Sequence, residues 1–93
     1  MMAHADAPVY SRRPDVLWRR SLDAVVLLPA GCEDPVTLPG TGAAVWDLLA
    51  APATLPELVE TLVEVYGEDP VTVERDVAAL LDRLARIAAI DAA

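Results

Sequence analysis

Residues 35–49 read PVTLPGTGAAVWDLL, and this stretch changes from strand to helix character within a few residues. Residues 36–38 are apolar or β-branched and lie between two prolines, which occur in sheets at edges and strand ends. Gly40 and Gly42 permit a sharp turn, and we expect Thr41 to cap the helix that follows. The stretch therefore predicts an edge strand that leads directly into a helix. Another peptide can add as a strand to such an edge.

Two further strands are expected before this one. Alternation of side chains predicts a strand over residues 16–20, and a continuous apolar run predicts a second over residues 24–28. A strand that is apolar on both faces is usually central. With a third strand from about Glu33 to Leu38, we expect a three-stranded antiparallel meander, because consecutive strands tend to be neighbours.

Three helices are expected after the sheet. The first covers about residues 41–50. Residues 54–57, Thr-Leu-Pro-Glu, form a capping-box pattern for a second helix, which Gly67 is expected to end. Asp69-Pro70 should open a third helix that runs to about Ala89.

This order of elements predicts an α+β domain of winged helix-turn-helix type, with a three-stranded antiparallel sheet followed by three helices. The domain is expected over residues 14–90. Residues 1–13 lack periodicity and are expected to form a mobile tail.

The charge balance argues against nucleic acid as a partner. The chain has 93 residues with 7 arginines, no lysine, 15 acidic residues and a net charge of −8. Such a field repels phosphate. No apolar run approaches the roughly 18 residues of a membrane helix, and the first residues do not resemble a secretory signal, so we expect a cytoplasmic protein with no membrane partner.

The sequence offers little for catalysis or metal binding. His4 is the sole histidine and falls in the expected tail, and Cys32 is the sole cysteine, expected to be a small packing group. We therefore expect no catalytic residue, no metal site and no cofactor. Trp18 and Trp46 are expected in the core.

One side of the third helix has two possible interpretations. Leu80 and Ile87 lie on a shoulder of its apolar stripe, and Asp76 and Arg83 lie just beyond them. This shoulder is either an ordinary core boundary or the wall of a groove that accepts an apolar side chain and orients it with charges.

Residues 38–49, LPGTGAAVWDLL, resemble the PqqD-like family, the precursor-peptide chaperones also called RiPP recognition elements. The similarity continues through residues 54–59, 66–67 and 73–84, and covers about residues 14–90. One departure is visible, since the family often has a glycine near the end of the third helix, where this chain has Ile-Ala-Ala-Ile.

The resemblance implies a domain that catalyses nothing and binds the leader segment of a ribosomally synthesised precursor peptide. The leader adds as a strand to the third strand and packs on the third helix. The domain then delivers the precursor to modifying enzymes, here expected to be the leader peptidase and cyclase of a lasso-peptide pathway; the family's pyrroloquinoline quinone chaperone serves a radical enzyme instead. The peptide-binding residues expected on this basis are Glu33, Val36, Thr37, Leu38, Asp76, Val77, Leu80, Arg83, Leu84 and Ile87.

Two alternative functions remain open. A winged-helix transcriptional regulator would bind DNA at low salt, which the net charge of −8 opposes. A small adaptor subunit would bind a folded protein through its apolar shoulder and would not bind an isolated extended peptide.

Overall fold

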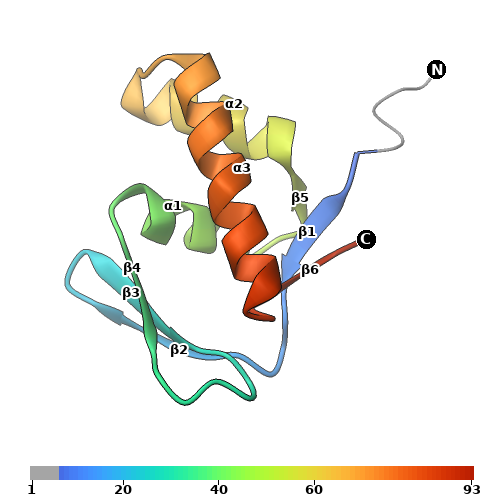
Figure 1. The fold of residues 1–93 in the computed structure, drawn as a ribbon. Coiled ribbons are helices and arrows are strands. Elements are labelled where there is room, and N and C mark those ends of the chain that lie inside the picture. Colours follow the sequence, from blue (N-terminus) through green and yellow to red (C-terminus); the bar gives the residue numbers. More distant parts are fainter. Residues whose placement is uncertain (1–6) are drawn as a thin grey trace.

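The computed structural model describes residues 7–93 and contains three helices packed beside two small antiparallel sheets (Figure 1). Residues 1–6, with His4 and the first part of the expected tail, lie outside the described residues. The elements in chain order are β1 (Val9–Arg12), β2 (Leu17–Ser21), β3 (Ala24–Leu28), β4 (Val36–Pro39), α1 (Thr41–Leu48), β5 (Ala53–Thr54), α2 (Leu55–Tyr66), α3 (Pro70–Arg86) and β6 (Ile90–Ala92).

The expected winged-helix architecture and the central position of the apolar strand are confirmed. One sheet has the order β2-β3-β4, with Val25 of β3 opposite Leu38 of β4. Both of these side chains are buried, because alternate residues of a strand point to the same face. The third strand begins at Val36 and not at Glu33, since Pro35 has no N–H to donate and the residues before it form a bend.

The core lies between this sheet and the helices. Trp46 of α1 is fully buried, as expected, and packs among aliphatic side chains from β3, β4, α2 and α3. The buried residues from those four elements are Val25, Leu27, Leu38, Leu58, Leu62, Val73, Val77, Leu81 and Leu84. Within residues 7–93, none of the helices is long and apolar enough to cross a bilayer.

The starts of α2 and α3 follow the expected capping chemistry. The Thr54 backbone N–H donates to Glu57 Oε1 at 2.8 Å, and the Glu57 N–H donates to Thr54 Oγ1 at 3.3 Å. Asp69 accepts from the Thr72 N–H at 3.0 Å. The expectation for Thr41 is wrong, because Thr41 is the first helical residue and Gly40, with φ 56°, is the N-cap without a side-chain cap.

A second sheet, of order β5-β1-β6, replaces part of the expected tail. Tyr10 of β1 lies opposite Ala53 of β5 and Ala92 of β6, so residues 9–12 are a strand and the prediction of a tail is wrong for them. The third helix ends at Arg86 and not at Ala89, because Ala88 adopts φ 61° and the Ala89 N–H turns back to the Leu84 carbonyl at 2.9 Å.

The two tryptophans have different environments. Trp18 is 42% exposed, so its assignment to the core is wrong, and it meets buried Trp46 edge-on with ring centroids 5.9 Å apart. The Arg12 guanidinium lies 4.8 Å from the Trp18 ring and 4.7 Å from the Trp46 ring, and donates to the Trp46 carbonyl. Partial burial lowers the pKa of Arg12, and the nearby Asp47 carboxylate opposes this shift. Arg12 therefore joins β1 to α1 and contacts both indole rings.

Candidate functional site

Strand β4 has one free edge. It pairs with β3 on one side, and no strand of the described chain pairs with its other side. The strand has four residues and prolines at positions 35 and 39, which limits uncontrolled pairing between copies. Its free backbone groups are therefore available to a short extended peptide.

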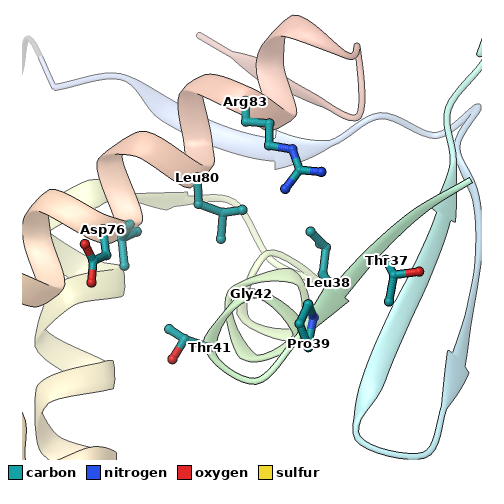
Figure 2. A pocket seen from close by; sticks show the side chains of 9 residues that line it. Thr37, Leu38, Pro39, Thr41, Gly42, Asp76, Leu80 and Arg83 are labelled. Carbon is teal, nitrogen blue, oxygen red and sulfur yellow. The ribbon is translucent and has the colours of Figure 1, made fainter.

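A hollow of about 260 Å³ lies between β4, the start of α1 and the middle of α3. Its lining is largely apolar and comes from Thr37, Leu38, Pro39, Thr41, Gly42, Asp76, Val77, Leu80 and Arg83. Figure 2 shows Leu80 pointing from α3 towards Leu38 and Gly42, with Asp76 and Arg83 to either side of it. The hollow is suited to one apolar side chain with polar neighbours.

Helical periodicity places the α3 side chains of this site. Asp76, Leu80 and Arg83 are spaced i, i+4 and i+7, so they project from one face of the helix over two turns. Asp76 Oδ1 lies 3.6 Å from Arg75 Nε, but both side chains are largely exposed and such a pair contributes little. Arg83 forms no ion pair with any residue from 7 to 93, so its guanidinium can bind an incoming acidic group.

Gly42 allows β4 and α3 to approach α1 closely. A Cβ atom at this position would lie 3.3 Å from Leu38 Cβ and 3.9 Å from Leu80 Cδ2. Glycine in a helix costs stability relative to alanine, so a helical glycine indicates that space is needed there. The absence of this one methyl group keeps the floor of the hollow open.

The structure brings six of the ten expected peptide-binding residues to the hollow, namely Thr37, Leu38, Asp76, Val77, Leu80 and Arg83. The other four lie elsewhere. Glu33 is exposed in the loop before β4, and Val36 and Ile87 are half-buried against the core. Leu84 is 0% exposed and supports the helix from within the core, so it is not available to a partner.

Three lining residues were not expected at this site: Pro39, Thr41 and Gly42. Pro39 is the last residue of β4, and Thr41 and Gly42 are the first residues of α1, so all three flank the turn at Gly40. In the sequence, turn and capping chemistry alone accounts for them. For Gly42, the sequence does contain one signal: a glycine is unfavourable within a helix, which indicates that space is needed at that position.

Among the described residues, the lining of the hollow contains one carboxylate, Asp76, and no histidine or cysteine. Among residues 7–93, no group of three or more His, Cys, Asp or Glu side chains is placed to hold a metal ion. Cys32 is half-buried and its Sγ lies 3.9 Å from the Ile87 carbonyl oxygen, away from the hollow's lining. What the site offers is a free strand edge, an apolar cavity and two charges of opposite sign.

Comparisons with known proteins give the family. The family model described as coenzyme PQQ synthesis protein D (PqqD) matches residues 24–90. The solved structure of TbiB1 in complex with the TbiA(beta) leader peptide is similar to this fold, with a TM-score of 0.76 and 28% sequence identity over 87% of this chain and 94% of that chain. No curated protein matches this chain significantly in sequence. Because the matched residues span well over half of the chain, it belongs to the PqqD family, as its sequence motifs indicate.

Proposed function

We propose that this protein binds the leader segment of a ribosomally synthesised precursor peptide, as a RiPP recognition element. The observation that carries the proposal is the free edge of β4 running beside the apolar hollow under α3. The similar fold of TbiB1, which was solved with a leader peptide, supports it.

Binding would combine two kinds of contact. The leader adds as an antiparallel or parallel strand to β4, and its backbone exchanges hydrogen bonds with residues 36–38. One leader side chain then enters the hollow and contacts Leu38 and Leu80. Backbone pairing tolerates many sequences, so the side chain in the hollow supplies the selectivity.

The charges at the hollow orient the leader. Arg83 favours an acidic leader residue on its side of the bound apolar side chain, and Asp76 favours a basic or neutral one on the opposite side. Reversing the leader's direction would bring like charges together. This arrangement selects one polarity of the bound strand.

In this proposal the protein performs no chemistry itself and presents the precursor to modifying enzymes. We assign these to a lasso-type leader peptidase and cyclase, on the resemblance of residues 38–42 to that group. The proposal places the protein in the cytoplasm, where ribosomal precursors are made. DNA binding is disfavoured because the net charge is −8 and the three arginines of α3 are matched by Glu74, Asp76 and Asp82.

The test is a fluorescence-polarisation titration with the leader peptide encoded beside this gene. We expect saturable binding at micromolar concentration or tighter, which a scrambled leader loses. Leu80→Asp should weaken binding about tenfold to a hundredfold, since filling the hollow with an apolar side chain is worth about 1.5–3 kcal/mol.

Val65→Asp is the matched control, because Val65 is a 67% exposed helical valine on α2 outside the hollow. Circular dichroism checks that both variants are folded. A folded protein that binds no leader, or a Leu80→Asp variant that binds like the parent, would contradict the proposal.

A further inference from the structure

A second groove lies between α2 and α3, on the opposite side of α3 from the first hollow. It has a volume of about 450 Å³ and is lined by Pro56, Val59, Glu60, Val63, Glu64, Pro70, Val71 and Glu74. Val71 lies nine residues before Leu80, which at about 100° per residue places the two side chains on opposite faces of the helix. The two sites can therefore be occupied at the same time.

The floor of this groove is apolar and unpartnered. Val59 and Val63 are half-buried on successive turns of α2, and Val71 at the start of α3 is 73% exposed. The α2 residues of the groove, Pro56 to Glu64, extend over about 12 Å of helix, which accommodates two apolar side chains one turn apart. Two packed helices with a ridge and groove of this kind can take a third helix against them.

The rim of the groove is acidic. Glu60 and Glu64 of α2 and Glu74 of α3 are exposed, and none of the three is ion-paired within the described part of the chain. Residues 54–82 contain eight acidic residues and one arginine, so most of the net charge of −8 lies on this half of the molecule. Arg75 contacts Asp76 and does not neutralise the rim.

We propose that this groove docks a basic amphipathic helix of a partner protein, with apolar side chains on Val59, Val63 and Val71 and with arginine or lysine at the three glutamates. Charge complementarity selects this occupant, since the groove combines an apolar floor with uncompensated carboxylates. A second copy of this chain is not suitable, because its α2 and α3 surfaces carry the same negative charge.

The groove gives the protein a second binding face. A partner enzyme that presents such a helix would be held on one side of α3 while a peptide occupies the other side. This use in delivery rests on the proposed function, but the binding of a basic helix does not.

The test uses a synthetic 18-residue helical peptide with leucines along one face and arginines on both flanks. A scrambled peptide of the same composition and a peptide with glutamate in place of arginine are the controls. In ¹⁵N-HSQC titrations we expect the arginine peptide to bind saturably, with shifts centred on Val59, Val63 and Val71, and to weaken as salt rises. Neither control peptide should produce these shifts.

Glu60→Lys/Glu64→Lys should weaken binding about tenfold, because two attractions become repulsions. Asp23→Lys/Asp34→Lys is the matched control, with the same change in net charge at exposed positions outside the groove. Val71→Asp, at a largely exposed site, removes the apolar contact without a cavity in the core.

The proposal would be overturned if the two lysine variants lost the same amount of affinity for the arginine peptide, or if the scrambled peptide bound equally well. It would also be overturned if the chemical-shift changes occurred at Leu80 and Thr37. Leader affinity should stay within about twofold in Glu60→Lys/Glu64→Lys. If the protein binds the basic helix but no leader peptide, the proposed function alone is rejected. If it binds the leader peptide but no basic helix, the proposal for the second groove alone is rejected.

Discussion

Gly42→Ala is expected to weaken peptide binding at the hollow while it changes the stability of the fold only a little. The added Cβ would lie 3.3 Å from Leu38 Cβ, which is attached to the backbone of β4 and cannot move independently, and 3.9 Å from Leu80 Cδ2, which can. The methyl group therefore occupies the floor of the hollow, in tight contact with Leu38 and in ordinary van der Waals contact with Leu80.

The effect on folding should be small because two contributions oppose each other. Replacing a helical glycine by alanine stabilises a helix by about 0.5–1 kcal/mol. The tight contact with Leu38 requires a shift of a few tenths of an ångström and costs a similar amount at the lower end of overpacking penalties, about 1 kcal/mol. The melting temperature should therefore change by no more than about 8 °C.

The effect on peptide binding should be larger. The bound side chain loses burial equivalent to at least one methylene, about 0.8 kcal/mol, and must also shift away from the new methyl group on the floor of the hollow. A total loss of about 1–2 kcal/mol corresponds to a Kd about five to thirty times higher. Fluorescence polarisation with the leader peptide measures this change directly.

Ala50→Ser is the control, since it adds one heavy atom at an exposed position just beyond α1 and should leave Kd unchanged. An unchanged Kd in a folded Gly42→Ala protein would mean that the bound peptide does not enter the hollow. A collapse of stability would mean that the space at Gly42 is part of the core.

Two predictions concern stability away from the hollow. Ala88→Gly should stabilise the protein by about 0.5 kcal/mol, because relief of the left-handed backbone at φ 61° outweighs the added chain entropy of glycine; a lower melting temperature would contradict this. Arg12→Lys should destabilise by about 1–2 kcal/mol in urea denaturation, because lysine keeps the charge but loses the paired donation to the Trp46 carbonyl and the planar contact with both indole rings; an unchanged midpoint would show that Arg12 only covers the surface.

The parts of the fold that could be predicted from the sequence depend on local chemistry. Three of these features involve only neighbours within a few residues: the capping box at Thr54, the start of α3 at Asp69-Pro70, and the left-handed Gly67 that ends α2. Strand β3 has a short apolar run that ends at Pro29, of which Val25 and Leu27 are buried. Such signals act before any tertiary contact forms, so a single sequence carries them.

The second sheet could not be predicted because its pairing is entirely non-local. Tyr10 pairs with Ala53 and Ala92, and the strands involved have two to four residues, too few for a visible alternation. Trp18 was misplaced for a related reason. Its neighbours include Arg12, which lies against both indole rings and comes from a strand that the sequence does not reveal.

The candidate site could be predicted from the sequence only in part. Helical spacing groups Asp76, Leu80 and Arg83 on one face of α3, and the structure places all three at the hollow. The same spacing cannot distinguish Leu80 from Leu84, which lies one turn further along and is completely buried. Packing of α3 against β6 and the core decides that difference, and a periodic pattern contains no information on it.

The short edge of β4 limits what backbone pairing alone can achieve. The three residues between Pro35 and Pro39 offer only a few hydrogen bonds, each worth about 0.5–1.5 kcal/mol net. Micromolar affinity requires about 8 kcal/mol beyond an association cost of at least about 4 kcal/mol. Side-chain burial in the hollow must therefore supply a large share of the binding energy, and a leader that keeps its strand propensity but loses its apolar anchor should not bind.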